Sequence, residues 1–422
     1  MLTAVVGINW GDEGKGRMVD LLSARYDIVV RYQGGNNAGH TVVNDRGKFI
    51  FNLLPSGILR PDTANVLGPG MVIDLEHLAG ELDALRDKGV DITQKQLKIA
   101  DRATICMPFH RQLDGLEEDR LADRKYGSTR RGIAPVYADK YRKKALRMGD
   151  LLYPDTLQEK AESLADWGSL LLRGYGQKPV GAHEVYGWLL RYGEAMLPYI
   201  CDTTAWLNAA IDRGESVMFE AQLGALRDLE LGIYPYTSSS CTLAAYAPIG
   251  AGVPARHVER VIGIMKAYSS CVGEGPFVCE FAGEEAERLR EAGSEYGAAT
   301  GRPRRVGGFD AVASRYGVLL QGATELAVTK LDVLSYMEKI PVCAAYEIDG
   351  VRCTDFPSGD RLLHAKPIYE YLEGFGTDIS HCRSFDALPG AAQVYVRWLE
   401  EAVGCRIAFV SVGAGRDEII IM

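Results

Sequence analysis

The sequence predicts an α/β fold, with a large, mostly parallel central sheet, helices on both faces and a helical subdomain. Short apolar runs alternate with amphipathic stretches along almost the whole chain of 422 residues, as in strand–helix–strand units. Glycine-rich turns follow the first two runs, and no repeat, low-complexity tract or linker divides the chain. We therefore expect one domain over residues 1–422, with a helical insertion at roughly 154–214.

The elements can be placed in order along the chain. A buried strand is expected at 3–9, a helix at 16–26 and a second strand at 27–33. A hairpin follows at 42–55, closed at 45–47, and an amphipathic helix at 75–89 ends on Gly89. Later strands are expected at 96–100, 216–221, 261–269, 326–334, 342–348 and 406–413. Ligands bind at the carboxyl ends of such strands, so the turns after residues 9, 33, 221, 269, 331 and 412 are candidates for the site.

The composition excludes several classes of protein. The net charge of −9 argues against a nucleic-acid groove or an anionic membrane surface as the partner. The nine cysteines form no CxxC pair, which argues against a disulfide framework or a zinc site. The first apolar run is short and reads as a strand, and no stretch approaches the ~20 apolar residues of a membrane span. We expect a cytoplasmic protein.

The first turn, INWGDEGKG at 8–16, has the parts of a phosphate site. It does not fit the Walker spacing, because Asn9 stands where the first glycine belongs and Gly16 follows Lys15. Its glycines still allow backbone N–H groups to approach phosphate oxygens. Asp12 beside a phosphate must either hold Mg²⁺ or act as a base. The alternative is a tight strand-to-helix turn with exposed charges.

The second turn, GGNNAGH at 34–40, brings a histidine to the end of the next apolar run. A protonated His40 would stabilise charge that develops on a leaving phosphate oxygen. The alternative is a structural histidine, which is the commoner role of a lone imidazole.

Three later segments carry further candidate residues. Residues 124–147 form a basic island with a Gly-Ser-Thr turn, and residues 297–305 carry arginines whose forks suit carboxylates. The sequence TKLD at 329–332 is similar to the guanine-reading motif of GTPases, in which one carboxylate accepts from the adjacent N1–H and N2–H₂ groups of guanine. Taken singly, each of the three is also compatible with a solvated loop or a strand end.

Together these blocks resemble the adenylosuccinate synthetases over nearly the whole chain. The matching segments include WGDEGKG, RYQGGNNAGHT, GSTRRGIAPVYADK, YPYTSSS, EYGAATGRPRRVGGFDAV, TKLDVL and SVGAGRDE. The resemblance implies a sheet related to the P-loop NTPases without a Walker A loop, in a homodimer. It also implies a GTP-dependent ligase that joins IMP and L-aspartate into adenylosuccinate, GDP and phosphate, the first committed step from IMP to AMP.

The resemblance implies a role for each matching residue. Asp12 takes the N1 proton of IMP, the 6-oxygen attacks the γ-phosphate of GTP, and the aspartate amine then displaces phosphate. His40 stabilises the β,γ-bridging oxygen, Lys15 neutralises phosphate, Gln222 acts on IMP, and Mg²⁺ is held by Asp12 and the Gly39 carbonyl. The remaining assignments are Asn37, Thr129, Lys143 and Ser238 to IMP, Thr300 and Arg302 to aspartate, and Gly14, Gly16, Thr41, Arg304, Lys330, Asp332, Ser411 and Gly413 to GTP.

The chain departs from the family pattern mainly around the IMP pocket. Where the family often reads FEGAQG this chain reads FEAQLG, so Gln222 comes one residue early and Leu223 takes the aligned place unless a bulge intervenes. Ser238 aligns with a threonine, and Arg130 stands in place of a glycine. Lys143 aligns with an arginine that reaches across the dimer to the IMP phosphate, so the charge is kept and the fork is lost.

Two alternatives to IMP ligation remain at the level of sequence. The first alternative is the same two-step chemistry on another purine nucleotide such as dGMP, and the shifted position of Gln222 motivates it. The second alternative is a non-catalytic protein that binds GTP or another nucleotide. The presence of both Asp12 and His40 argues against it, since binding alone needs no general base.

Overall fold

The computed structural model describes residues 1–37, 39–44, 47–297 and 301–422. Its centre is a ten-stranded sheet. Every neighbouring pair in it is parallel except β19–β20, which is antiparallel and forms one edge. The strands lie in the order β20 (Ile419–Ile421), β19 (Ile407–Ser411), β15 (Glu325–Thr329), β11 (Arg260–Lys266), β1 (Leu2–Gly7), β10 (Val217–Gly224), β2 (Ile28–Arg31), β5 (Ala64–Leu67), β7 (Leu97–Ala100) and β9 (Ile200–Cys201).

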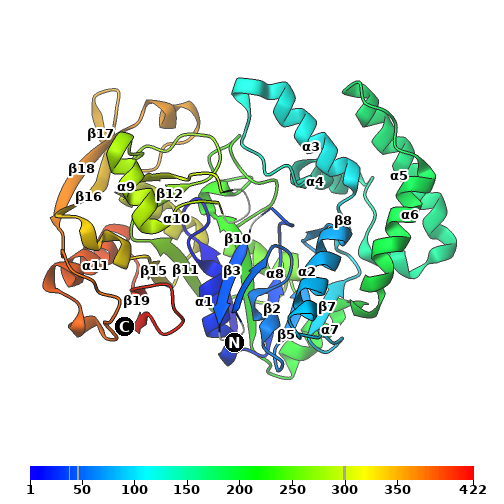
Figure 1. Cartoon of the computed structure of the whole chain (residues 1–422), viewed down its shortest axis with the longest axis horizontal. Coiled ribbons are helices and arrows are strands. Elements are labelled where there is room, and N and C mark those ends of the chain that lie inside the picture. Colours follow the sequence, from blue (N-terminus) through cyan, green and yellow to red (C-terminus); the bar gives the residue numbers. More distant parts are fainter. Residues whose placement is uncertain (38, 45–46, 298–300) are drawn as a thin grey trace.

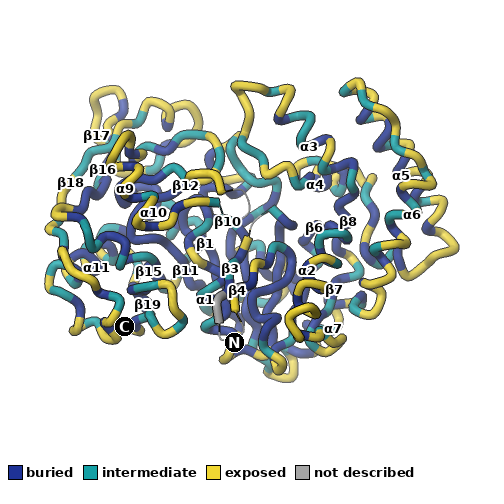
Figure 2. The backbone as a smooth tube through the Cα atoms, in the orientation of Figure 1, coloured by how far each residue is buried: buried dark blue, intermediate teal, exposed yellow. Residues whose placement is uncertain are grey.

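Helices cover both faces of this sheet, as the alternating pattern predicts (Figure 1). On one face α1 (Lys15–Leu22) buries Met18 and Val19 against Val5 of β1. On the other face α7 (Thr203–Asp212) and α8 (Ala247–Ala251) pack against Ala4 and Val6. Because neighbouring side chains of a strand point to opposite faces, the apolar run of β1 is buried on both sides. Figure 2 shows the central strands buried beneath helices with exposed outer sides.

The remaining helices and strands surround the central sheet. The other helices are α2 (Leu75–Asp87), α3 (Pro108–Leu121), α4 (Ile133–Arg142), α5 (Pro154–Gly174), α6 (Ala182–Gly193), α9 (Gly283–Gly293), α10 (Ala311–Gln321) and α11 (Gly390–Val403). Smaller sheets comprise β3 (His40–Asn44) with β4 (Gly47–Phe51), β6 (Val72–Ile73) with β8 (Thr104–Ile105), β12 (Ser269–Cys271) with β13 (Arg305–Gly307), and β14 (Phe309–Asp310) with β16 (Lys339–Ile348), β17 (Val351–Cys353) and β18 (Lys366–Glu373).

Three sequence predictions need correction. The strand expected at 326–334 ends at Thr329, because Lys330 adopts φ 60° and a 3₁₀ turn follows. The strand expected at 261–269 ends at Lys266, and Ser269–Cys271 pairs with β13 instead. The strand expected at 342–348 belongs to the small antiparallel-rich sheet around β16 and not to the central one. Each departure lies at the site edge or in a peripheral layer.

The other predicted elements match the structure closely. The hairpin at 42–55 corresponds to β3 and β4, although residues 45 and 46 of its turn lie outside the described part of the chain. Residues 154–214 hold α5, α6 and α7, together with the short edge strand β9. Figure 1 places α5 and α6 at the opposite end of the molecule from β16–β18. No helix in the described residues is long and apolar enough to cross a membrane.

Candidate active site

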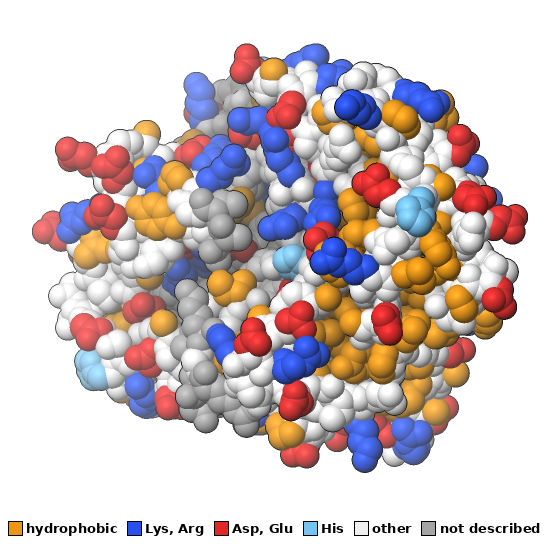
Figure 3. All heavy atoms as spheres, turned by 45° about the vertical axis from the view of Figure 1, so that its right-hand side comes forward, with side chains coloured by type: hydrophobic (Ala, Val, Ile, Leu, Met, Phe, Trp, Pro, Cys, Tyr) orange, Lys and Arg blue, Asp and Glu red, His pale blue; other side chains and the backbone are white. Residues whose placement is uncertain are grey.

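The carboxyl ends of six parallel strands bring the candidate turns to one edge of the central sheet. The strand order β19, β15, β11, β1, β10, β2 places the 8–16 turn in the middle. The TKLD segment and Ser411 lie to one side of it, and the end of β2 with residues 33–37 lies to the other. Figure 3 shows a hollow near the middle of the molecular surface, with Lys and Arg side chains around it. A positively charged hollow suits anionic ligands.

The turn between β1 and α1 is built around Glu13, a residue that sequence reasoning missed. Its Oε1 accepts hydrogen bonds from the backbone N–H groups of Asn9 (3.1 Å) and Gly11 (2.8 Å). Its Oε2 lies 2.7 Å from Lys15 Nζ, and both side chains are only 3% exposed. Lys15 is therefore paired inside the turn. One feature of the sequence could have indicated the role of Glu13: it is a carboxylate in a tight turn, and the backbone N–H groups of such a turn need acceptors.

Asp12 lies at the tip of the same turn. It adopts φ 58°, its side chain is 31% exposed, and its Oδ2 lies 3.1 Å from Arg304 Nη2. Gly11 at φ 110° and Gly14 at φ 96° supply the left-handed backbone that this tight turn requires. The carboxylate of Asp12 therefore faces outward, held by a cation from a distant loop.

His40 is buried against the first turn and bound to a carboxylate. A Cβ atom on Gly16 would lie 2.8 Å from His40 Cβ, so the two glycine-rich turns are in contact. His40 Nδ1 lies 2.5 Å from Glu220 Oε1 on β10. Glu220 also accepts hydrogen bonds from Ser56 N (2.9 Å) and Ser56 Oγ (2.7 Å). Sequence reasoning missed Glu220, although it lies within FEAQLG.

The surroundings of this pair determine which nitrogen of His40 carries the proton. Burial lowers the pKa of His40 below its usual value, although Glu220 acts in the opposite direction. Burial also acts to raise the pKa of Glu220, but His40, Arg31 and Ser56 outweigh it and lower that pKa. A neutral imidazole beside a carboxylate donates from Nδ1, which leaves Nε2 as an acceptor. His40 Nε2 is buried and has no hydrogen-bond partner among the described residues.

Arg304 and Lys330 converge on a buried carboxylate, Glu295. Arg304 Nη1 lies 2.8 Å from Glu295 Oε2 while its Nη2 reaches Asp12. Lys330 Nζ lies 3.2 Å from Glu295 Oε1 and donates a hydrogen bond to the Gly293 carbonyl. Sequence reasoning named both cations but not the acid that binds them.

The predicted guanine-binding residues include a carboxylate with an unused acceptor. Asp332 Oδ1 is buried without a hydrogen-bond partner in the described structure, and burial raises the pKa of the Asp332 carboxyl.

Arg17 of α1 donates to Ser411 Oγ (2.5 Å) and to the Gly413 carbonyl (2.6 Å). Arg17 is a further site residue that sequence reasoning missed. It ties the end of β19 to the first helix.

Gln222 and Leu223 both lie within a bulge of β10, the irregularity that sequence analysis considered. β1 pairs Val5 with Glu220 and Gly7 with Gly224, so β10 carries extra residues between these points. Gln222 is fully buried, and its Nε2 donates to the Gly35 carbonyl at 2.6 Å. Leu223 is half-buried at φ 58°. The Gln222 amide therefore supports the 33–37 turn, and a direct contact with IMP stays a prediction.

The other predicted IMP-binding residues lie on several elements. Asn37 Oδ1 accepts from Gly35 N at 3.2 Å. Ser238 is half-buried and Thr129 is exposed. Lys143 is exposed at the end of α4 with φ 63°. No contact recorded among these four side chains joins them into one pocket in the described structure.

The predicted aspartate-binding residues and Thr41 can be placed only in part. Arg302 is exposed and Thr41 is half-buried. Thr300 lies outside the described residues. Their assignments stay predictions.

The donor atoms fit a magnesium ion that is completed by phosphate oxygens. The described residues contain no group of three or more His, Cys, Asp and Glu side chains that would hold a metal by themselves. Mg²⁺ commonly binds one or two carboxylates together with substrate phosphates and water. The outward-facing Asp12 carboxylate and the exposed backbone of Gly39 offer hard oxygen donors on the two turns that touch.

Comparisons with known proteins agree over the full length. Residues 4–420 match the family model described as adenylosuccinate synthetase. The adenylosuccinate synthetase of Cutibacterium acnes is 46% identical over 420 residues, covering 99% of this chain and 98% of that protein. Adenylosuccinate synthetase 2 of Pseudoalteromonas translucida is 48% identical, with 99% of both chains covered.

Solved structures show the same likeness. The fully ligated adenylosuccinate synthetase of Plasmodium falciparum superposes with a TM-score of 0.93 at 31% identity, covering 100% of this chain and 99% of that one. The cyanophage S-2L succinoaminodeoxyadenylate synthetase, bound to dGMP and dATP, gives a TM-score of 0.60 at 19% identity, covering 100% of this chain and 95% of that one. The second likeness is one of fold alone.

Proposed function

The chain belongs to the adenylosuccinate synthetase family, and from this membership we infer that it is the GTP-dependent ligase that joins IMP and L-aspartate. The products are adenylosuccinate, GDP and phosphate. The observation that carries the assignment of residues is the contact between the two turns that hold Asp12 and His40. A carboxylate and an imidazole on touching turns are the groups that activation of a purine oxygen needs.

The first step we propose is phosphorylation of IMP. Asp12 removes the N1 proton of IMP, and the electron pair moves to the 6-oxygen, which attacks the γ-phosphorus of GTP. The bond from that phosphorus to the β,γ-bridging oxygen breaks, and GDP leaves. His40 stabilises the bridging oxygen from Nε2 once protonated, because Nδ1 is held by Glu220.

The second step is displacement of phosphate by aspartate. The amine of L-aspartate attacks C6 of 6-phosphoryl-IMP, and phosphate leaves with the former 6-oxygen. Thr300 and Arg302 hold the aspartate carboxylates. Lys15 neutralises phosphate after exchanging its partner Glu13, which lies 2.7 Å away. Mg²⁺ would be held by Asp12 and the Gly39 carbonyl, and would supply positive charge against the phosphates.

GTP is selected by the TKLD segment. The free Oδ1 of Asp332 accepts from the N–H groups of guanine, and Lys330 lies along the base. Arg304, whose Nη2 lies 3.1 Å from Asp12 Oδ2, also contacts the nucleotide. The other GTP contacts are Gly14, Gly16, Thr41, Ser411 and Gly413.

IMP is held by Asn37, Thr129 and Ser238, with Gln222 supporting the 33–37 turn through Gly35. Lys143 reaches the IMP phosphate of a neighbouring subunit in a homodimer. Its exposed position supports this assignment, as does the exposed Tyr141 beside it, which is 74% exposed. We place the chain, as one domain with its helical insertion, in the cytoplasm.

A steady-state assay tests this function. The purified protein receives IMP, GTP, Mg²⁺ and L-aspartate, and each component is omitted in turn. We expect adenylosuccinate and phosphate only when all four are present. Replacing IMP by dGMP tests the acceptor, and a clear preference for dGMP would overturn the assignment. A protein that binds GTP and IMP but releases no phosphate would be a binding protein.

A further inference from the structure

Glu295 lies at the centre of a buried cluster of charges. Glu295 is 0% exposed and lies just beyond α9, which ends at Gly293. Lys266 Nζ lies 2.7 Å from its Oε1, Lys330 Nζ lies 3.2 Å from the same oxygen, and Arg304 Nη1 lies 2.8 Å from Oε2. The hydroxyl of Tyr268 also donates to Oε1. One carboxylate thus binds three cations from three separate segments.

The three cations need this carboxylate to remain together. Lys266 ends β11, Lys330 follows β15, and Arg304 precedes β13. Burial lowers the pKa of Lys266 to about 8, and Lys330 and Arg304 repel it, while Glu295 acts against both effects. Burial acts to raise the pKa of Glu295, but the three cations outweigh it and hold that pKa well below its usual range. Glu295 is therefore ionised at neutral pH.

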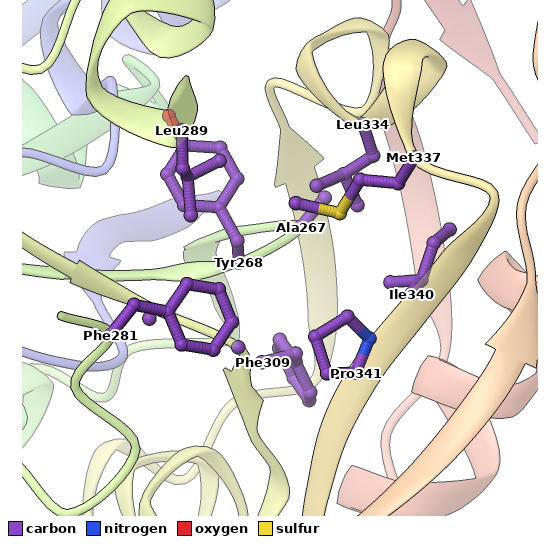
Figure 4. A pocket seen from close by; sticks show the side chains of 11 residues that line it. Ala267, Tyr268, Phe281, Leu289, Phe309, Leu334, Met337, Ile340 and Pro341 are labelled. Carbon is purple, nitrogen blue, oxygen red and sulfur yellow. The ribbon is translucent and has the colours of Figure 1, made fainter. Parts of the chain in front are cut away.

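The position of Glu295 is fixed from behind by packing. Figure 4 shows the Tyr268 ring in an apolar pocket that is also lined by Leu289, Phe281 and Leu334. Leu289 belongs to α9, which leads into Glu295. The Tyr268 ring is 3% exposed, so its hydroxyl has little freedom to leave Glu295. A carboxylate held in this way keeps its bound cations in fixed places.

Two of those cations reach different parts of the site. Arg304 uses Nη1 for Glu295 and Nη2 for Asp12, 3.1 Å away, and its buried Nε has no partner in the described structure. Lys330 belongs to the TKLD segment beside Asp332. We propose that Glu295 is a positioning residue that couples the guanine site to the Asp12 turn through Lys330 and Arg304. This inference rests on the proposed function.

The coupling has a simple physical form. Asp12 must release Arg304 before it can act on IMP. When the ion pair between Asp12 and Arg304 breaks, Glu295 still holds the Arg304 guanidinium in the site. A GTP molecule that contacts Lys330 weakens the ion pair between Lys330 and Glu295. The ion pair between Glu295 and Arg304 becomes stronger as a result. Loss of the Glu295 charge therefore disturbs both GTP binding and the chemical step, although Glu295 itself contacts neither guanine nor the reacting atoms.

The test compares full-length wild type with Glu295→Gln, Glu295→Asp and the control Glu291→Gln. Glu291 is an exposed acid in α9, the helix that precedes Glu295. We measure Tm, KM for GTP, and kcat at saturating substrates below the Tm of every variant. Glu295→Gln should raise KM for GTP roughly tenfold and lower kcat roughly tenfold or more, as loss of both binding and transition-state positioning does. Glu295→Asp should recover part of both, and Glu291→Gln should stay within about twofold of wild type.

Several outcomes would overturn the proposal. A folded Glu295→Gln protein in which only one parameter changes, or neither, shows that Glu295 serves one site or the fold alone. If Glu295→Gln does not fold, Tyr268→Phe replaces it, because this variant removes one hydrogen bond to Glu295 and keeps the ring. It should raise KM for GTP and lower kcat together by a few fold, and unchanged values contradict the coupling. Inactive wild type would instead refute the proposed function.

Discussion

His40 Nδ1 lies 2.5 Å from Glu220 Oε1, and the opposite ring nitrogen is buried without a partner in the described structure. The two observations belong together. A carboxylate that accepts from Nδ1 fixes both the tautomer and the ring orientation, so Nε2 is the nitrogen available to a ligand. β10 supplies the carboxylate and the glycine-rich turn after β2 supplies the imidazole.

Glu220→Gln should therefore impair turnover more than binding. Ser56 N donates to Glu220 Oε2 at 2.9 Å, so a glutamine would keep its oxygen there and present its NH₂ group to His40. That arrangement places a donor against Nδ1 and removes the carboxylate charge, so His40 cannot become the protonated imidazolium that stabilises the bridging oxygen. We expect kcat to fall roughly 10²-fold or more, approaching the loss in His40→Asn, with GTP affinity retained. Steady-state kinetics and calorimetric GTP binding measure both, and a near-normal kcat would remove the pair from the chemistry.

Asp332→Asn should weaken selection of GTP over ATP. The carboxylate offers an unused buried acceptor at Oδ1, whereas an asparagine would present a donor to the donors of guanine. We expect the ratio of kcat/KM for GTP and ATP to fall by roughly 10²-fold, since a site built for hydrogen bonds discriminates strongly. Asp417→Asn, in an exposed position of the nearby C-terminal loop, is the control. An unchanged ratio would mean that TKLD is only the end of a strand.

Lys143→Ala should raise KM for IMP roughly tenfold, because a charge contact to phosphate is lost. The neighbouring exposed Lys144→Ala serves as the matched control. If Lys143 acts across a dimer, mixing Lys143→Ala with Asp12→Asn subunits creates one site that contains both native residues. Activity at low IMP should then exceed that of either variant alone. A mixture that shows no gain, with subunit exchange verified, would place Lys143 outside the neighbour's site.

Asp310 should make the protein less stable as the pH rises from 4 to 6. Burial raises the pKa of this carboxyl from 3.8 to about 6. In that window the unfolded chain releases the proton while the folded chain keeps it, so rising pH favours unfolding by up to roughly 3 kcal/mol. Asp310→Asn removes the effect and keeps a side-chain oxygen for the N–H of Ala313 at the start of α10. The wild-type Tm, relative to the variant, should fall between pH 4 and 6 and then level off. A constant difference would contradict it.

The sequence was sufficient for the layers of the fold, because strand runs such as 3–9 and 27–33 have apolar centres and the helices are amphipathic. It was not sufficient for strand ends at the site. Lys330 adopts a left-handed conformation that ends β15 at Thr329, and the apolar pattern of the sequence does not predict this end. The β16 strand reads like a central strand, since its burial comes from a separate small sheet.

For the site, sequence reasoning named the residues expected at the ligands but not those that hold them. Glu13, Glu220 and Glu295 are all buried acids, and Glu220 and Glu295 contact residues far away in the chain, such as His40 and Lys266. No local sequence pattern predicts a contact between positions 40 and 220, because the two residues are brought together only by the fold. Arg17 is likewise joined to Ser411 only when β19 and α1 come together.

The oxygen bound to C6 of IMP provides the most direct test of the two-step account. IMP labelled with ¹⁸O at that position is incubated with the enzyme, GTP, Mg²⁺ and L-aspartate, and the released phosphate is analysed by mass spectrometry. Attack of the 6-oxygen on the γ-phosphate, followed by displacement at C6, predicts one ¹⁸O atom in each phosphate. Release of unlabelled phosphate together with adenylosuccinate would contradict it.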